Sequence, residues 1–255
     1  MRDEVIGLSQ LPEMSEVWQE TMGWQPSVQQ QAQLQRLYEL VLAGNRQLNL
    51  TRITEPQEFW EKHLWDSLRG IKPWLTKPQE HEPQENEPQR IIDIGTGGGF
   101  PGIPAAIVRP DWQVTLLDST RKKLAFVDSL LTALELSNAR TWVNRAEVLG
   151  QQRHHRAKYD LALIRAVATA SVCAEYALPL LKIGGTAVLY RGQWTEAEAI
   201  GLEGALQQLG GVIEAIEPFT TPLTAGVRHC LYLKKIEPTE ARFPRSVGLA
   251  VQRPL

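Results

Sequence analysis

A run of ten residues from Asp93 to Gly102, DIGTGGGFPG, has the composition of a loop that cradles a nucleotide-like cofactor. It follows the apolar pair Ile91-Ile92 and precedes a helix-like stretch, Ile103 to Val108. Glycines at the end of a strand allow a tight turn, bring bare backbone close to a ligand, and direct the N-terminus of the next helix toward it. The run therefore indicates a cofactor site between a strand and a helix.

Two glycine templates overlap in this run. Gly97-x-Gly99-x-x-Gly102 fits the dinucleotide fingerprint, whereas Asp93-x-Gly95-x-Gly97-x-Gly99 places an acid two residues before the first glycine. An acid beside a pyrophosphate is unfavourable, but a cationic ligand such as the sulfonium and amine of S-adenosylmethionine tolerates it. The second template is therefore favoured. A nicotinamide-dependent oxidoreductase and an ordinary glycine-rich turn are the alternatives.

The length and composition of the chain indicate a globular protein. Its 255 residues are 43% hydrophobic, which suits one large domain with an appendage and a full core. The two cysteines, Cys173 and Cys230, lie in a helical and a strand-like pattern, which predicts reduced thiols in the core and no metal site. No stretch resembles a signal peptide or reaches the length of a membrane span, so we expect a soluble, cytoplasmic protein.

Positive charge is concentrated in the part of the chain that carries the glycine run. Residues 1–89 contain 8 Lys and Arg against 14 Asp and Glu, a balance of −6, and residues 90–255 contain 19 against 15, a balance of +4. This asymmetry favours a polyanionic partner, with solvated surface loops as the alternative for each cluster. The side chains expected to bind RNA are Lys122, Lys123, Arg145, Arg191, Arg242 and Arg245.

The N-terminal part, residues 1–76, is predicted to be a helical cap. Apolar residues recur at helical spacing from Ser27 to Asn45 and again from Pro56 to Ile71. The segment KPQEHEPQENEPQR at 77–90 has four glutamates and no apolar residue, so we expect an exposed acidic loop. Residues 91–255 then form the cofactor-binding domain with a basic C-terminal tail.

Strand-like and helix-like segments alternate after this loop, which predicts a Rossmann-like α/β fold with a mainly parallel sheet covered on both faces. The last two strands are separated only by a loop and are expected to form an antiparallel hairpin, as in class I S-adenosylmethionine-dependent methyltransferases. The seven predicted strands are Ile91–Ile94, Gln113–Leu117, Arg140–Val143, Asp160–Ile164, Thr186–Tyr190, Val212–Pro218 and His229–Lys235. The predicted helices are Ile103–Val108, Lys122–Leu136, Ser171–Leu181 and Glu196–Leu209, with a turn at Lys182–Gly185.

Ligands of such sheets bind beyond the carboxyl ends of the strands, so the residues that follow each strand matter most. Asp118 follows the second strand, and its carboxylate is suited to accept hydrogen bonds from two ribose hydroxyls, with helix capping as its alternative role. Ser119 and Thr120 are suited to cap the next helix. The backbone and acid of Asn144 to Glu147, after the third strand, are expected to hold the adenine edge.

The residues after the fourth strand, Arg165-Ala166, narrow the choice of methyl acceptor. Amino-group methyltransferases place Asn or Asp there, followed by Pro-Pro and an aromatic residue, and carbon-5 pyrimidine methylation needs a cysteine nucleophile. This stretch has neither, which leaves an atom that is already nucleophilic, such as guanine N7. That atom loses no proton, so the reaction needs alignment and exclusion of water. Arg165 would position the cofactor carboxylate or the target base, with a structural salt bridge as the alternative.

Several motifs together resemble the glucose-inhibited division protein B family, and the resemblance covers nearly the whole chain. The motifs are the run from Asp93 to Pro104, Leu-Leu-Asp-Ser ending at Ser119, Arg145-Ala-Glu, Arg165-Ala166, Phe243-Pro-Arg, Asn49-Leu-Thr, Lys62-His63 and Asp66-Ser67-Leu68. The resemblance implies a bacterial S-adenosylmethionine-dependent methyltransferase that forms 7-methylguanine in 16S ribosomal RNA. Its partner would be that RNA or the small ribosomal subunit, and we expect a monomer.

The resemblance also implies which residues contact the cofactor. These are Gly95, Phe100, Asp118, Ser119, Thr120, Ala146, Glu147 and Arg165, and the glycine template adds Asp93, Gly97 and Gly99. A protein that binds cofactor and RNA without turnover remains an alternative, because a reaction that needs no catalytic base leaves no acid–base motif in the sequence.

Overall fold

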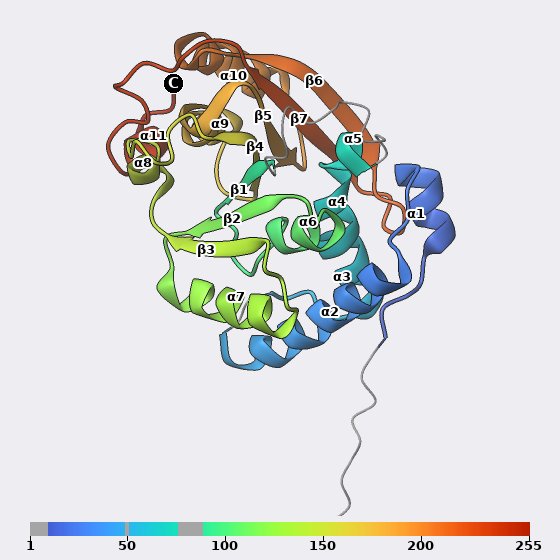
Figure 1. Cartoon of the computed structure of the whole chain (residues 1–255). Helices are drawn as coiled ribbons and strands as arrows, with labels where there is room; N and C mark the ends of the chain where they lie inside the picture. The colour runs from blue at the N-terminus through green and yellow to red at the C-terminus, as the bar shows by residue number, and fades with distance from the viewer. Residues whose placement is uncertain (1–9, 49–50, 76–88) are drawn as a thin grey trace, which may run out of the picture.

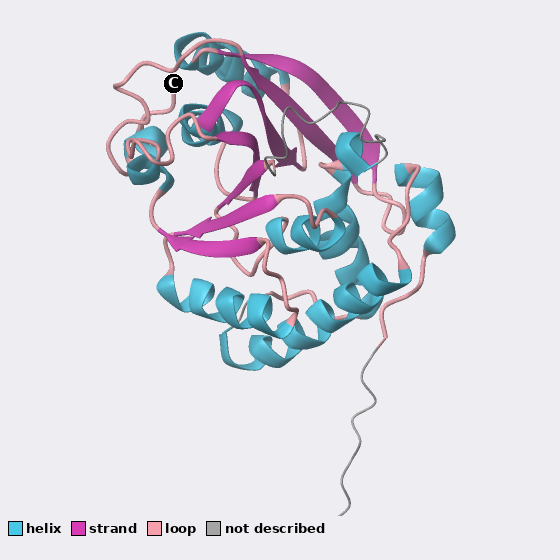
Figure 2. Ribbon diagram, viewed as in Figure 1, coloured by secondary structure: helices cyan, strands magenta, loops and turns pink. Residues whose placement is uncertain are grey.

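A seven-stranded sheet forms the centre of the protein, as the computed structural model shows for residues 10–48, 51–75 and 89–255 (Figures 1 and 2). The strands are β1 (Arg90–Ile94), β2 (Gln113–Asp118), β3 (Ala139–Val143), β4 (Tyr159–Arg165), β5 (Leu181–Arg191), β6 (Gly211–Thr220) and β7 (Val227–Lys235). Their order in the sheet is β3-β2-β1-β4-β5-β7-β6. Strands β1 to β5 pair in parallel, and β7 pairs antiparallel with both β5 and β6. The predicted parallel sheet with an antiparallel C-terminal hairpin is therefore confirmed.

Strand β5 is longer than predicted. It begins at Leu181 and includes the segment Lys182–Gly185 that the sequence predicts as a turn. The pairing with β4 shifts between Tyr159 and Leu161, so the extra residues of β5 form an irregularity there. Gly184 has a φ of +83° within it, a value that glycine adopts without a steric penalty. The glycine pair thus produces a local irregularity within the strand, and the turn predicted at these residues ahead of the strand is wrong.

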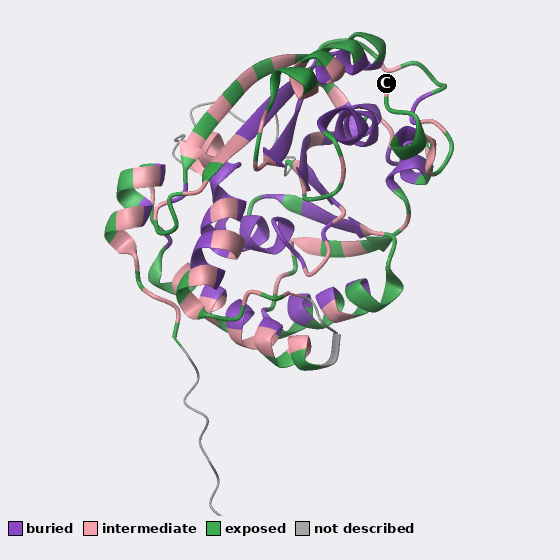
Figure 3. Cartoon of the chain, turned by 180° about the vertical axis from the view of Figure 1, so that it is seen from behind, coloured by how far each residue is buried: buried purple, intermediate pink, exposed green. Residues whose placement is uncertain are grey.

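Two apolar cores lie on opposite faces of the sheet, because successive side chains of each strand point to opposite faces. Ile91 of β1 belongs to the core under the helices α2 (Val28–Leu48), α6 (Gly102–Val108) and α7 (Arg121–Ala133). The next residue, Ile92, belongs to the core on the other face. The helices of that face are α8 (Ala146–Leu149), α9 (Ala170–Ala177), η2 (Leu178–Leu180), α10 (Glu196–Leu209) and α11 (Leu249–Gln252). In Figure 3 the buried, purple segments lie on the central strands and on the helices that cover them.

The N-terminal helices share the apolar core on the face of the sheet that α6 and α7 cover. Helix α1 (Ser15–Met22), which the sequence analysis did not predict, adds Trp18 and Met22 to the core that also holds Ile103 and Leu124. The predicted helix from Pro56 to Ile71 is divided into α3 (Pro56–Phe59), the π-helix η1 (Trp60–Trp65) and α4 (Asp66–Arg69), followed by α5 (Lys72–Leu75). The cap therefore shares its core with the sheet. Most of the predicted acidic loop, and Asn49, lie outside the described residues.

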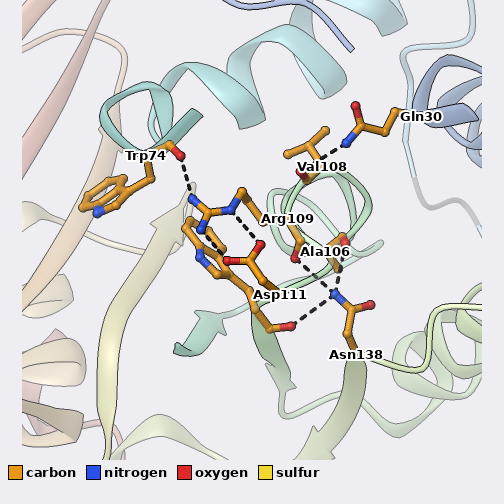
Figure 4. A network of polar contacts seen from close by, with 8 residues as sticks. Gln30, Trp74, Ala106, Val108, Arg109, Asp111 and Asn138 are labelled. Atoms are coloured by element: carbon orange, nitrogen blue, oxygen red, sulfur yellow. Dashed lines mark hydrogen bonds and ion pairs between the residues drawn. The ribbon is translucent and has the colours of Figure 1, made fainter. Parts of the chain in front are cut away.

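Helix α6 is held at its C-terminus by side chains from distant parts of the chain (Figure 4). The side-chain nitrogen Nδ2 of Asn138 donates to the carbonyl oxygens of Ala106, Arg109 and Trp112 at 3.0, 3.3 and 3.1 Å. The side chain of Gln30 donates to the carbonyl oxygen of Val108 at 3.1 Å. The carbonyl groups of Ala106 and Val108 lie in the last turn of the helix, where a helix end leaves carbonyl oxygens without an intrahelical partner. The two donors fix the helix whose other end carries the glycine run.

Replacing Asn138 by Ala is expected to lower the free energy of unfolding by about 1–3 kcal/mol, because partly buried carbonyl oxygens lose their donor. Urea denaturation followed by circular dichroism measures the change. Asn138→Asp keeps the size of the side chain but has no N–H to donate, so it should be at least as destabilising. Ser137→Ala, at the exposed neighbouring position, serves as control and should shift stability by less than about 0.5 kcal/mol. Equal stability of Asn138→Ala and Ser137→Ala would contradict the anchoring role.

Candidate functional site

A cleft of about 260 Å³ lies at the carboxyl ends of β1, β2, β3 and β4, where a ligand of a parallel sheet is expected. Its floor is formed by the ends of β1 and β2, and its walls come from the segments that follow β3 and β4. The cleft is lined by Ile94, Gly95, Leu117, Asp118, Ser119, Asn144, Arg145, Ala146, Glu147, Val167, Ala168, Tyr176 and Val251. The structure thus brings together the predicted residues Gly95, Asp118, Ser119, Ala146 and Glu147.

The glycine turn supplies bare backbone beside the cleft. Gly95, Gly97 and Gly99 all have positive φ, at +75°, +59° and +100°. A Cβ at Gly95 would lie 2.6 Å from Val167, so this position has room only for glycine. At Gly97 the nearest atom to such a Cβ is the Gly95 carbonyl oxygen at 3.9 Å. The space above Gly97 is therefore open and can receive a ligand.

Asp93 lies beneath the glycine turn and is fully buried. Its Oδ2 accepts hydrogen bonds from the Thr96 hydroxyl at 2.6 Å and from the Gly102 amide at 2.8 Å. Its Oδ1 is buried with no hydrogen-bond partner in the described part of the chain. Burial raises the pKa of Asp93 to about 6, although both hydrogen bonds act in the opposite direction. The carboxylate expected at the lip of the loop does not line the cleft, and it braces the turn from below.

Asp118 ends β2 and faces the glycine turn across the cleft floor. One carboxylate oxygen accepts the Gly97 amide at 3.0 Å, and the other accepts the Thr120 amide at 2.8 Å. A carboxylate has about four lone-pair sites, so acceptor capacity remains for ligand hydroxyls. Thr120 occupies the N-cap of α7, but its side chain makes no capping hydrogen bond. Asp118 instead accepts the backbone N–H of that position, as its alternative role at the helix start predicts, and ribose binding stays a prediction.

Glu147 closes the cleft on the β3 side and is buried. Its Oε1 accepts hydrogen bonds from Arg145 at 3.0 Å, from the Tyr176 hydroxyl at 3.2 Å and from the Gly248 amide at 3.1 Å. Burial favours the neutral acid, but the hydrogen bonds outweigh it and lower the pKa of Glu147. Tyr176 and Val251 were not predicted, because they reach the cleft through tertiary packing and carry no local motif.

Arg165 and Phe100 lie between the sheet and the cap, and neither lines the cleft. One nitrogen of Arg165 donates to Asp66 Oδ2 and to the Lys62 carbonyl oxygen, both at 2.9 Å. This is the salt bridge that the sequence analysis considered as the alternative role. The Phe100 ring stacks on His63, with centroids 4.6 Å apart. Burial, with the charges of Arg165 and Lys62, lowers the pKa of His63 to about 3, so this ring is neutral at pH 7.

The cations predicted to bind RNA differ in their exposure and in whether an acidic side chain already pairs with them. Lys122 and Lys123 are exposed in the first turn of α7. Arg191 donates to the Ala168 carbonyl oxygen at 2.7 Å and also pairs with Glu198. Arg245 forms a salt bridge with the buried Glu175 and is mostly covered. The remaining two, Arg145 and Arg242, are exposed but contact Glu147 and Glu240. The C-terminal segment thus uses Arg245 to dock on α9.

Residues 10–48, 51–75 and 89–255 present neither a metal-binding cluster nor a membrane-spanning helix. No cluster of three or more His, Cys, Asp or Glu side chains suited to a metal ion occurs there. Within the same residues, no helix combines the length and apolar character needed to span a bilayer.

Two solved structures share the fold. The antibiotic-resistance methyltransferase Kmr superposes with a TM-score of 0.51 at 15% identity, over 60% of this chain and 89% of that chain. The CMeT domain of the citrinin polyketide synthase superposes with a TM-score of 0.53 at 13% identity, over 81% of this chain and 66% of that chain. At such identities the likeness concerns the fold alone. It confirms the predicted class I methyltransferase fold, and the antiparallel strand β7 agrees with it.

Sequence comparison identifies the family. The family model of the rRNA small subunit methyltransferase G (GidB) matches residues 30–225. The ribosomal RNA small subunit methyltransferase G of Trichormus variabilis is 62% identical over 245 residues, which cover 96% of this chain and 98% of that relative. The proteins of the same name from Nostoc punctiforme and Synechococcus elongatus are 60% identical over 245 residues and 56% identical over 238 residues. The resemblance seen in the motifs is confirmed, and the chain belongs to the rRNA small subunit methyltransferase G family.

Proposed function

We propose that the protein transfers the methyl group of S-adenosylmethionine to N7 of a guanine in 16S ribosomal RNA. The observation that carries the proposal is the cleft beside the glycine turn, in a chain whose relatives are named ribosomal RNA small subunit methyltransferases. Neither the family match nor the fold supports the nicotinamide-dependent oxidoreductase or the non-catalytic binding protein.

The chemistry of the cleft fits this cofactor. The Asp118 carboxylate at the end of β2 is suited to accept the ribose hydroxyls, because two of its lone-pair sites remain available. Apolar side chains of Ile94, Leu117 and Ala146 offer a surface for the adenine ring. The open backbone at Gly97 leaves room for the aliphatic part of the molecule. When bound, S-adenosylmethionine supplies an electrophilic methyl group on a sulfonium.

The acceptor is inferred from what the site lacks and what guanine N7 requires. Both cysteines are buried outside the cleft, and burial raises the pKa of Cys173 to about 11 and that of Cys230 further. Neither is therefore an accessible thiolate for carbon-5 methylation. Guanine N7 needs no deprotonation, so residues that fix geometry and exclude water are sufficient.

Arg165 is proposed to act by position and charge. The salt bridge with Asp66 and the bond to the Lys62 carbonyl oxygen hold its guanidinium between β4 and the cap. Its positive charge lies 5.9 Å from the centroid of Phe100, the residue that follows the glycines. We infer that it orients the target base or the cofactor carboxylate at this boundary, as a positioning residue.

The substrate is proposed to be RNA held by exposed cations near the cleft. Lys122 and Lys123 lie in the first turn of α7, which begins two residues after Ser119, and Arg145 lies at the opposite wall. Arg242 is exposed in the C-terminal segment. We further propose that the protein acts in the cytoplasm as a monomer.

Incubation of the protein with methyl-labelled S-adenosylmethionine and either naked 16S ribosomal RNA or small ribosomal subunits is expected to label the RNA. Reduction and aniline treatment should then cleave the chain at a single guanine, which identifies 7-methylguanine. A protein extract without RNA is the control and should remain unlabelled. Label on RNA that resists this cleavage would refute N7 as the acceptor, and absence of label would refute the activity.

Gly97→Val is expected to abolish cofactor binding and leave the fold largely intact, because a branched side chain fills the open space above the turn. The positive φ adds backbone strain, and together these effects should weaken binding of S-adenosylhomocysteine by at least about 100-fold. Isothermal titration calorimetry measures the affinity. Gly184→Val is the matched control, since Gly184 also has positive φ and open space but lies in the irregular part of β5. Gly184→Val should lower the stability of the protein and keep its affinity for S-adenosylhomocysteine. If Gly97→Val also keeps this affinity, the ligand does not lie over the glycine turn.

A further inference from the structure

The edge strand β3 exposes a tryptophan. It is the first strand in the sheet order, so one of its sides has no neighbouring strand. None of its five residues is buried, whereas most residues of β1 and β2 are (Figure 3). The side chain of Trp142 is 37% exposed. A single exposed apolar residue is common on protein surfaces, so any role of this indole has to be argued from what surrounds it.

Trp142 and Arg140 share one face of β3. Arg140 is in register with Thr115 and Trp142 with Leu117, whose side chain belongs to the core on the α9 face. The intervening Thr141 points the other way, since its hydroxyl donates to Asp128 of α7 at 2.7 Å. The face with Arg140 and Trp142 is thus the one that α7 does not cover.

The indole of Trp142 packs against a buried histidine, His155. Its ring lies 4.7 Å from the ring of His155, centroid to centroid. His155 is itself buried, and its Nδ1 makes a 2.7 Å hydrogen bond with the Tyr159 hydroxyl of β4. A fixed aromatic ring loses little conformational entropy when a ligand stacks on it. The arrangement is therefore a preformed platform.

The surroundings of this platform are positively charged. Residues 139–158 contain five Lys and Arg against one acid, Glu147, and Arg145 pairs with that acid. Three of the cations, Arg140, Arg153 and Lys158, are exposed, as is His154. Burial, followed by the charges of Arg140, Arg90 and His154, lowers the pKa of His155, which reflects a positive potential at this face.

We propose that Trp142 and Arg140 form a docking platform for a single-stranded segment of the RNA substrate, with a base stacked on the indole and the phosphates held by the cations. Aromatic side chains among Lys and Arg are the chemistry that binds unpaired nucleotides. The platform leads to the active site, because Asn144, two residues after Trp142, already lines the cofactor cleft. A second copy of the chain does not suit this face, since an isologous contact would oppose like charges. The inference rests on the proposed function.

The test compares variants of the complete protein for affinity to naked 16S ribosomal RNA by filter binding. Trp142→Ala is expected to weaken binding roughly 5- to 150-fold, the loss of one stacked base, and Trp142→Phe should retain most of the affinity. Arg140→Gln should reduce the salt dependence of the affinity by about one phosphate contact. Val143→Ala is the matched control, because Val143 is equally exposed, at 39%, on the opposite face of the same strand. It should bind RNA as the parent does.

Affinity for S-adenosylhomocysteine is measured for every variant and should be unchanged, which separates RNA docking from misfolding or damage to the cleft. Trp142→Ala with unaltered RNA affinity would refute the platform even if the parent protein methylates RNA normally. An effect of Trp142→Ala on binding to small subunits but not to naked RNA would also refute it, and would point to a ribosomal protein as the partner. A parent protein that labels no RNA would instead refute the proposed function.

Discussion

The buried carboxylate of Asp93 is the interaction on which the cofactor site depends. It joins the end of β1 to the first residue of α6 through the Gly102 amide, and it holds the Thr96 hydroxyl within the turn. A Cβ at Gly102 would lie 2.7 Å from this carboxylate and 2.2 Å from Leu116, so only glycine allows the approach. The turn is therefore built around the acid. Its glycines serve the ligand on one side and this buried group on the other.

The cap is coupled to the same turn by contacts that cross from the helices to the sheet. Phe100 leaves the turn and packs on Phe59 and His63, while Arg165 at the end of β4 is bound to Asp66. The buried Glu61 of η1 accepts a hydrogen bond from the backbone N–H of Thr224, in the β6–β7 loop, at 3.0 Å. This bond also connects the cap to the β6 edge of the sheet. A movement of the cap would therefore move the end of β4 and the turn together. The π-helical turn η1 carries Glu61 and His63, and Asp66 follows it directly.

Local patterns predicted most of the sheet and the floor of the site. The place of Asp118 in the cleft was predictable because it directly follows a strand, and the strand is visible in the alternation of apolar segments. The positions of Asp93, Phe100 and Arg165 were less predictable. Whether an acid next to a glycine run faces the ligand or the protein depends on which side of the turn the following helix packs. Tyr176 and Val251 were missed because their approach to Glu147 and the cleft depends on how α9 and the C-terminal segment fold back.

The place of the C-terminal segment in the cleft determines when the cleft can be completed during synthesis of the chain. Gly248 and Val251 follow all seven strands in the chain, yet one binds Glu147 and the other lines the cleft. Arg156 donates to the carbonyl oxygens of Thr239 and Phe243, and Arg245 docks on Glu175, so the segment is fixed along its length. A nascent chain that has reached the end of β7 already contains every strand but not this wall. The cleft is therefore completed late in synthesis, after the last strand of the sheet has been made.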